Sequence, residues 1–368
     1  MHYKNPILPG FHPDPSICRA GEGFYLVTSS FEYLPGIPIF YSEDLVCWRK
    51  IGHCLTRPSQ ADLAGCPCSQ GIYAPTIRYH NGRFYVAVHN KTLGASYLVT
   101  AQDPAGAWSD PIFLPKGGID PSLFFDEDGR VYLTANGVDA KGRRGILGSR
   151  IDPDTGALLE GPHFLWAGTG GRCPEGSHLY RVGKWVYLLI AEGGTQYQHR
   201  ITLARARHPF GPFDACPHNP LLTHANDQTL EIQGLGHGDW VQDASGRWFI
   251  LFLGFRINGK YFHHLGRETF LAPMAWDDDG WPHIHGGQPI AECMEADLPV
   301  SAPLPPGPSS DAFGKEALPL DFNVLRTLLP RRYALSASPG ALTLYGWEKT
   351  LDDEDSPAFV GVRQTAFS

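Results

Sequence analysis

The sequence of 368 residues lacks clustered positive charge and long apolar runs. It holds 30 Lys and Arg against 38 Asp and Glu, for a net charge of −8. Because phosphate binding needs clustered cations, this balance argues against a nucleic-acid partner. The longest apolar runs, residues 185–191 and 248–253, are far too short to cross a bilayer. We therefore expect no nucleic-acid partner and no membrane span.

Paired cysteine spacings and an apolar signal core are also missing. Of the 8 Cys, only Cys66 and Cys68 lie close together, and no C-x-x-C pair of the zinc type occurs. We expect free thiols in a reducing compartment. Residues 1–6 (MHYKNP) show no secretory signal core. Taken as a complete start, this N-terminus predicts a cytoplasmic protein.

Helical periodicity is scarce, whereas strand patterns are frequent. Gly (42) and Pro (32) form about a fifth of the chain and interrupt most helical windows. Each of the strand patterns follows a hairpin turn that contains Gly. The predicted strands are residues 24–28, 84–89, 130–135, 185–191 and 247–253. The sequence therefore predicts an all-β domain over residues 1–298.

An internal repeat accompanies these strands. Each copy has a lead residue, a Ser, Thr or Asp two residues later, a turn, and an aromatic-rich strand. The lead positions are 14, 74, 120, 175 and 237, so their spacings are 60, 46, 55 and 62 residues. A self-similar unit of this size, built of short strands, predicts a β-propeller.

The lead residues are expected to converge, because each blade of a propeller starts at the central axis. They are Asp14, Ala74, Asp120, Glu175 and His237. Three carboxyl groups at one axis indicate catalysis, and glycoside hydrolysis typically needs two carboxyl groups across the scissile bond. A third carboxylate would raise the pKa of the acid and keep it protonated.

Two other interpretations of these acidic residues stay open at this point. Taken singly, Asp14 and Asp120 each precede a proline, as turn residues often do, and Glu175 would be a surface residue. Clustered acids can also hold calcium, but calcium loops draw their ligands from one short segment. The shared lead position in the repeat favours catalysis.

The composition changes near residue 298. Residues 298–310 (LPVSAPLPPGPSS) hold five Pro in thirteen residues, which is typical of an extended linker. Further strand-like stretches follow at residues 341–347 and 358–367. The tail is too short for an independent β-sandwich. It therefore either packs on the propeller or belongs to a longer protein.

Six stretches carry a resemblance to a known family. They are residues 5–16 (NPILPGFHPDPS), 71–76 (GIYAPT), 118–126 (GIDPSLFFD), 174–176 (PEG), 192–195 (EGGT) and 266–269 (GRET). Together they resemble the β-xylosidases of glycoside hydrolase family 43. The resemblance implies a five-bladed β-propeller, in agreement with the five repeats, and an enzyme that inverts anomeric configuration.

The resemblance also implies roles for the three carboxyl groups. It makes Asp14 the general base, Glu175 the general acid, and Asp120 the group that orients the acid and raises its pKa. An inverting enzyme separates its two working carboxyl groups by about 6.5–9.5 Å to leave room for a water.

Further pocket residues follow from the resemblance. Arg267 is expected to hold substrate hydroxyls, with a structural ion pair as the alternative, and Phe31 and Tyr73 to form pocket walls, with plain core packing as the alternative. His237 is expected near the axis, where it would contact a cation or a water. A lone His is more often a hydrogen-bonding residue, so no cofactor is required and Ca²⁺ near the axis is an option. The predicted substrate-binding residues are Phe31, Tyr73, Ala74, Thr195, Arg267 and His237.

The sequence departs from the family pattern at three places. Tyr73 stands where such xylosidases usually have Trp, and Ser177 stands where they usually have Pro. The third departure is at the C-terminus. Residues 321–326 (DFNVLR) and 359–367 look like the first strands of the β-sandwich that follows the propeller in this branch, and the sequence holds only this part of it. We accordingly assign residues 1–298 to the propeller, 299–320 to a Pro-rich linker and 321–368 to a partial, truncated β-sandwich.

The predicted function is that of an inverting exo-glycosidase that releases β-D-xylose from the non-reducing ends of short xylo-oligosaccharides. The alternative within this class is an α-L-arabinofuranosidase or a bifunctional enzyme. The alternative of another class is a carbohydrate-binding propeller that truncation has left inactive. The set of Asp14, Asp120 and Glu175 favours an enzyme, because desolvation and repulsion make converging acids costly. The expected partner is a small-molecule substrate, and a homo-oligomer is left open.

Overall fold

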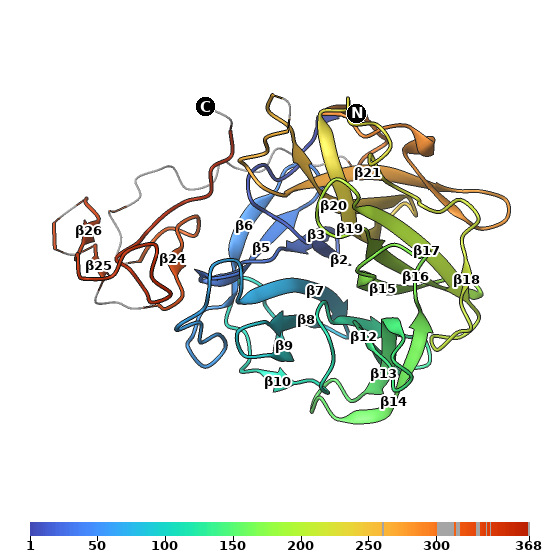
Figure 1. The fold of residues 1–368 in the computed structure, drawn as a ribbon, viewed down its shortest axis with the longest axis horizontal. Coiled ribbons are helices and arrows are strands. Elements are labelled where there is room, and N and C mark those ends of the chain that lie inside the picture. The colour runs from blue at the N-terminus through green and yellow to red at the C-terminus, as the bar shows by residue number, and fades with distance from the viewer. Residues whose placement is uncertain are drawn as a thin grey trace.

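Five four-stranded antiparallel sheets are arranged around a central axis (Figure 1). The computed structural model describes residues 1–259, 261–299, 313, 317–328, 332–335, 337–338 and 340–366. Within these residues the one helix is a 3₁₀ turn, His285–Gly287, and no helix is long and apolar enough to cross a membrane. The predicted all-β, five-bladed propeller is confirmed.

The blades follow one another in chain order, and each runs outward from its first strand. The first strands contact one another around the ring. The blades are β2 (Ser16–Ala20), β3 (Gly23–Val27), β5 (Gly36–Ser42) and β6 (Arg49–Leu55); β7 (Ile72–His80), β8 (Arg83–Asn90), β9 (Ala95–Ala101) and β10 (Ile112–Phe113); β11 (Ser122–Phe125), β12 (Val131–Val138), β13 (Arg144–Ile151) and β14 (Leu158–Trp166); β15 (Glu175–Val182), β16 (Trp185–Glu192), β17 (Arg200–Ala206) and β18 (Asp214–Ala215); and β19 (Ile232–Gln242), β20 (Trp248–Arg256), β21 (Glu268–Trp276) and β22 (Pro282–Ile284). The predicted strands coincide with the second strand of each blade.

The hydrophobic core lies between the blades. Apolar side chains of blades one and two form one cluster, which includes Ile39 and Val86. Similar clusters join blades two and three, and blades three and four. The largest cluster joins blades four, five and one. Each sheet therefore buries both faces against its neighbours, as sheets packed face to face do.

The N-terminal segment closes the ring against blade five. Strand β1 (His2–Lys4) pairs with β23 (Cys293–Glu295), which follows blade five. The Asn5 side chain donates to the Leu271 carbonyl at 3.0 Å and accepts from the Leu271 N–H at 2.9 Å. Leu8 then bridges to Thr269 of the same strand. Closure therefore depends on the N-terminal segment rather than on a strand exchanged into the last blade.

A buried polar network links the first strands of all five blades. Arg78 of blade two forms an ion pair with Asp239 of blade five, and Ser16 of blade one donates to the same carboxylate at 2.6 Å. Arg78 also donates to His178 Nδ1 of blade four at 3.0 Å. The Ser122 hydroxyl of blade three lies 2.9 Å from that nitrogen. Burial would raise the pKa of Asp239, but the Arg78 charge outweighs it and holds that pKa well below its usual range.

The C-terminal segment packs on the propeller, which was one of the two outcomes expected for it. Strand β24 (Val324–Leu325) pairs with β4 (Tyr33–Leu34), and this segment lies beside the ring in Figure 1. Arg326 donates through Nε to the Cys66 carbonyl at 2.6 Å. Arg363 donates to the Phe11 carbonyl at 2.8 Å. These contacts tie the tail to blades one and two and to the segment that precedes Asp14.

The strands of the tail are shorter than the sequence indicates. Within residues 341–347 only β26 (Thr343–Leu344) is a strand, and it pairs with β25 (Tyr333–Ala334). The stretch at 358–367 contributes one bridge, Asn323 to Gly361, while residue 367 lies outside the described residues. Most of the predicted linker, residues 300–312 and 314–316, also lies outside them. All 8 Cys are free thiols, as predicted.

Candidate active site

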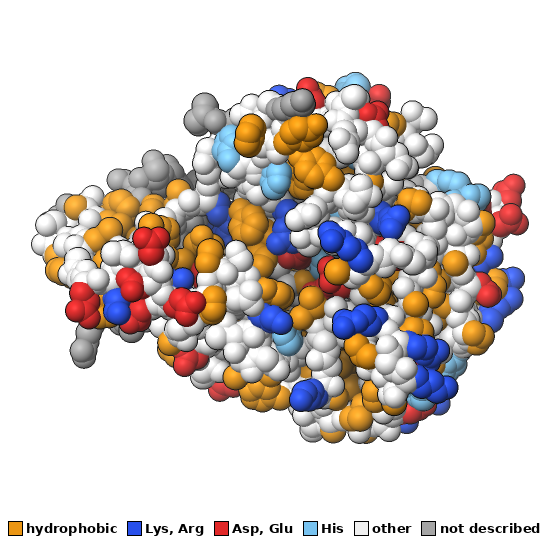
Figure 2. Space-filling view, viewed as in Figure 1, with side chains coloured by type: hydrophobic (Ala, Val, Ile, Leu, Met, Phe, Trp, Pro, Cys, Tyr) orange, Lys and Arg blue, Asp and Glu red, His pale blue; other side chains and the backbone are white. Residues whose placement is uncertain are grey.

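Four of the five lead residues come together at the axis. Asp14 Oδ1 of blade one lies 3.4 Å from His237 Nδ1 of blade five. Asp120 Oδ2 of blade three accepts the N–H of Gly176, the residue after Glu175 in blade four, at 3.0 Å. The His237 ring packs on Gly176 so closely that an added Cβ there would lie 3.0 Å from it. Figure 2 shows acidic and histidine side chains in a hollow near the middle of one propeller face.

The backbone helps to aim these side chains. Asp14, Asp120 and His237 adopt left-handed conformations, with φ of 55°, 57° and 46°. Such conformations are uncommon for residues other than Gly and cluster at functional sites. Each lies just before, or within, the first strand of a blade. Gly176, with φ of 58°, makes the corresponding turn next to Glu175.

Asp14 is held in its ionised form. Arg267 Nη1 donates to its Oδ1 at 3.0 Å and Ser29 Oγ donates to its Oδ2 at 2.6 Å. Burial would raise the pKa of Asp14, but the charges of Arg267 and His237 and the Ser29 hydrogen bond outweigh it and hold the pKa below its usual value. A buried carboxylate that is charged at neutral pH can accept a proton.

Glu175 and Asp120 have raised pKa values. Burial and the negative charge of Asp14 raise the pKa of Glu175 to about 7, against the opposing charge of Arg267. Burial also raises the pKa of Asp120, and although His237 opposes this, Glu175 and Asp14 add to it. Since Asp120 accepts the Gly176 N–H, its charged form is favoured. Both carboxyl groups have raised pKa values, so this part of the cluster can hold a proton near neutral pH.

Aromatic rings border the carboxyl cluster. Phe31 stacks on Phe11 with ring centroids 5.5 Å apart, and Tyr73 packs against Phe31 at 5.4 Å. The Arg267 guanidinium lies 5.6 Å from the Phe31 centroid. Arg267 thus connects the Asp14 carboxylate to the aromatic wall. Ring faces of this kind pack against the C–H face of a sugar.

The remaining predicted residues have different positions. Ala74, next to Tyr73, is buried, whereas Thr195 is exposed on the loop after β16. In that EGGT stretch the buried side chain is that of Glu192, which accepts the N–H groups of Thr169 and Gly171. Glu192 therefore fixes the loop at residues 168–171.

Phe11, Ser29 and His199 also belong to the site but were not predicted. Ser29 and Phe11 contact Asp14 and Phe31 directly, and the buried His199 ring packs against Gly236, the residue before His237. Phe11 lies within one of the matching stretches, so that stretch was its available signal. Ser29 and His199 have no comparable signal in the sequence.

The axis does not offer a calcium cage. Ca²⁺ takes six to eight oxygen ligands, whereas His237 presents one nitrogen beside one carboxylate. Among the described residues, the only group of three or more His, Cys, Asp or Glu with all ligand atoms within 4.8 Å lies elsewhere. The residues at the axis therefore do not fit this ion, and we assign no step to it.

Comparison with known proteins supports a single family for this site. Residues 3–282 match the family model described as glycosyl hydrolases family 43, and residues 310–368 match the beta xylosidase C-terminal concanavalin A-like domain. The chain is 43% identical over 372 residues to the non-reducing end alpha-L-arabinofuranosidase of Bacteroides ovatus, covering 100% of this chain and 69% of that protein. It is 36% identical over 391 residues to a beta-xylosidase of Bacillus subtilis, covering 99% and 72%.

A solved structure agrees with these sequence matches. The xylan beta-1,4-xylosidase from Bacillus halodurans superimposes with a TM-score of 0.93 at 38% identity, over 99% of this chain and 72% of that one. The sequence similarity to these relatives therefore covers the propeller, the tail and the residues of the carboxyl cluster. The chain belongs to glycosyl hydrolases family 43 and is a glycoside hydrolase.

Proposed function

We propose that this glycoside hydrolase is an inverting exo-enzyme that releases β-D-xylose from the non-reducing ends of short xylo-oligosaccharides. The observation that carries the proposal is that the pKa values of two carboxyl groups in one cluster are displaced in opposite directions. The pKa of Asp14 is lowered and that of Glu175 is raised to about 7. Environments that push two pKa values apart supply one base and one acid.

In the proposed reaction Asp14 takes a proton from a water molecule as the water oxygen attacks the anomeric carbon. Glu175 gives its proton to the glycosidic oxygen as the bond from that oxygen to the anomeric carbon breaks. The new C–O bond forms on the opposite face, so the configuration inverts. Asp120 orients Glu175 and raises its pKa. The two carboxyl groups supply all the proton transfers, and the step needs no cofactor.

We assign the predicted pocket residues to a subsite for the terminal sugar. Phe31 and Tyr73 provide the ring faces, and Ala74 lies beside them. Arg267 keeps a guanidinium between Asp14 and Phe31, where it can donate to sugar hydroxyls. We propose that His237 contacts the substrate or its water from the fifth blade. Thr195, exposed on its loop, is the remaining proposed substrate contact.

A second candidate is the hydrolysis of α-L-arabinofuranosides, alone or in addition. It is favoured by the 43% identity to a relative named for that activity and by the match to a xylosidase/arabinosidase of Butyrivibrio fibrisolvens at 41%. Tyr73, in place of the expected Trp, changes one wall of the sugar pocket. Both substrates present a terminal pentose to the same carboxyl pair.

The deciding experiment compares an aryl β-D-xyloside with an aryl α-L-arabinofuranoside. We expect release from the xyloside, and NMR of the first product is expected to show the α-anomer of xylose. Release from the arabinoside alone would transfer the assignment to the second candidate. A folded chain that hydrolyses neither substrate would favour a carbohydrate-binding propeller without catalysis. A first product with the β-configuration would overturn inversion.

The domain division and the location are part of the same proposal. We propose that residues 1–298 form the catalytic propeller, 299–320 a linker and 321–368 part of a β-sandwich. Limited proteolysis should then cut first within 299–320. A cytoplasmic location would suit short oligosaccharides that have been taken up, and localisation of the tagged protein in its source cell tests this.

A further inference from the structure

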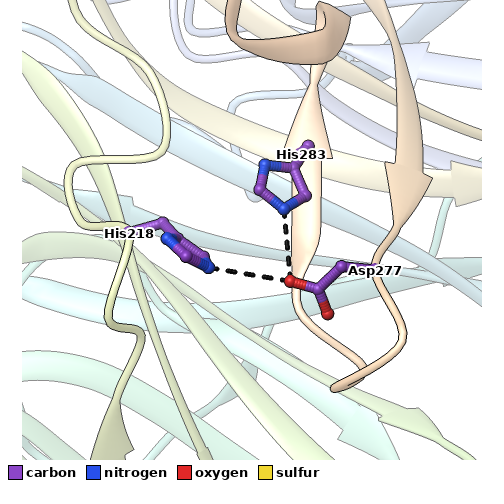
Figure 3. A group of neighbouring side chains, drawn as sticks. All are labelled: His218, Asp277 and His283. Carbon is purple, nitrogen blue, oxygen red and sulfur yellow. Dashed lines mark hydrogen bonds and ion pairs between the residues drawn. The ribbon is translucent and has the colours of Figure 1, made fainter.

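Three side chains far from the carboxyl cluster point at one another on the rim of the propeller. His218 follows β18, Asp277 follows β21, and His283 lies in β22. The His283 Nε2 atom is 3.2 Å from Asp277 Oδ2, and the His218 Nε2 atom is 3.6 Å from the same oxygen. Figure 3 shows both imidazole rings directed at this one carboxylate.

The group joins two neighbouring blades at their outer edge. Strands β18 and β22 are the last strands of the fourth and fifth sheets, whereas Glu175 and His237 lie on the first strands. The group is therefore separated from the carboxyl cluster by the full width of a blade. It belongs to no part of the hydrolytic site.

The two blades hold these ligands in fixed positions. The Trp281 N–H donates to Asp277 Oδ1 at 2.8 Å, which leaves Oδ2 facing the imidazoles. Arg205 of blade four donates to the carbonyls of Asp279 and Gly280 in the same turn at 2.7 and 3.1 Å. Its guanidinium also stacks 3.8 Å from the Trp281 ring centroid. The turn that carries Asp277 is thus clamped to the blade that carries His218.

The spacing suits a shared metal ion better than hydrogen bonds alone. Bonds of about 2.0–2.2 Å in a tetrahedral site place any two ligand atoms about 3.3–3.6 Å apart. The two N···O distances, 3.2 and 3.6 Å, match this spacing closely. The longer one exceeds an ordinary hydrogen bond. Among the described residues, no lysine or arginine forms an ion pair with Asp277, so the imidazoles are its only partners of this kind.

We propose that His218, Asp277 and His283 bind a divalent transition-metal ion of the Zn²⁺ type and fasten blade four to blade five. Imidazole nitrogens suit Zn²⁺, Ni²⁺ and Cu²⁺, whereas Ca²⁺ and Mg²⁺ require oxygen ligands. Three protein ligands leave a fourth position for water. The position of the site defines its role. Because the ligands come from both blades, the ion would bind only when the two blades are packed together, and its binding would stabilise the ring.

The test uses the whole chain without a histidine tag, stripped with a chelator. Calorimetric titration with Zn²⁺ is expected to show one site of micromolar affinity, and Co²⁺ to give the visible absorption of a tetrahedral site. Zn²⁺ at about a hundredfold excess over Kd should raise Tm by about 3–6 °C. Hydrolysis of an aryl pentoside by the wild type should be the same with and without the ion.

Substitutions separate this site from adventitious binding. His218→Ala and His283→Ala should each abolish the high-affinity site and the shift in Tm. His163→Ala is the matched control, because His163 is an exposed imidazole paired with a single carboxylate, Glu160, at 3.3 Å. It should leave both signals unchanged. Exposed cysteines also bind Zn²⁺, but all three variants keep every cysteine. A difference in Zn²⁺ binding between the variants therefore does not come from the cysteines.

Clear outcomes would overturn the proposal. They are Zn²⁺ binding that survives both His218→Ala and His283→Ala, an equal loss of binding in His163→Ala, or stabilisation by Ca²⁺ instead of Zn²⁺. If an alanine variant does not fold, His218→Gln, which keeps most of the side-chain volume, replaces it. An inactive hydrolase would leave these binding measurements intact, so the proposal is tested independently of the enzymatic function.

Discussion

Arg78 and Asp239 form a two-point ion pair between blade two and blade five. The Nη1 atom lies 2.7 Å from Oδ2 and Nη2 lies 3.1 Å from Oδ1. Asp239 is fully buried, and Tyr180 and Ser16 also donate to it. This pair joins two blades that are not adjacent in the ring. It therefore fixes the relative positions of the first strands near the carboxyl cluster.

Removing one partner of this pair should be strongly destabilising. Asp239→Asn leaves the Arg78 charge buried and unpaired, so we expect a loss of about 3–5 kcal/mol in the free energy of unfolding. Urea denaturation measures it. Asp154→Asn is the control, because Asp154 pairs with Arg83 at the surface, where such pairs contribute about 1 kcal/mol or less. Equal effects of the two substitutions would contradict the central role of the pair.

Asp14→Asn should abolish turnover with every substrate. The amide cannot accept the proton of the attacking water, and general base catalysis typically contributes about 10²–10⁴-fold. We expect kcat to fall by at least this factor for both an activated aryl xyloside and xylobiose. Circular dichroism should remain that of the wild type. A variant that keeps wild-type kcat would remove Asp14 from the mechanism.

Glu175→Gln should discriminate between leaving groups. A dinitrophenolate leaves without protonation, so 2,4-dinitrophenyl β-D-xyloside should retain most of its kcat. Xylobiose needs the proton, and its kcat should fall about 10²–10⁴-fold. Measuring both substrates with one preparation provides the internal control. Equal losses would argue that Glu175 does not act as the acid.

The pH profile should be bell-shaped with its alkaline limb near neutrality. Glu175 works in its protonated form, and its pKa is raised to about 7, so kcat/KM should decline as the pH rises through this value. Asp120→Asn removes the carboxyl group that we propose raises the pKa of Glu175, so this limb should shift to lower pH. Measurement of kcat/KM between pH 4 and pH 9 tests it; an unmoved limb would assign Asp120 to orientation alone.

Ser29→Ala should move the opposite limb. The Ser29 hydroxyl donates to ionised Asp14 at 2.6 Å, so its loss should raise the pKa of Asp14 and shift the acidic limb to higher pH. The plateau value of kcat should change little. Ser30→Ala is the matched control, since the Ser30 hydroxyl accepts the Ile37 N–H instead. A shift in the control alone, or in neither, would contradict this prediction.

The convergence of Asp14, Asp120 and Glu175 was predictable because they share one position of a repeat, and repeats of a propeller meet at the axis. The hydrogen bonds that Arg267 and Ser29 donate to Asp14 were not. Arg267 lies 253 residues from Asp14, and its contact depends on how blade five packs on blade one. The His218 and His283 pair depends in the same way on the packing of outer strands. The predicted lengths of the tail strands were too long. A strand-like composition does not supply the neighbouring strand that a strand must pair with.

Ring closure through Asn5 and Leu271 links segments that lie 266 residues apart. At a synthesis rate of about 5–20 residues per second, Asn5 emerges from the ribosome roughly 15–50 s before its partner. During that time the apolar face of blade one, including Ile17 and Leu26 of the largest core cluster, has no blade five to cover it. The newly made chain is therefore most vulnerable to aggregation just before its last blade is complete, and slower translation would lengthen that exposure.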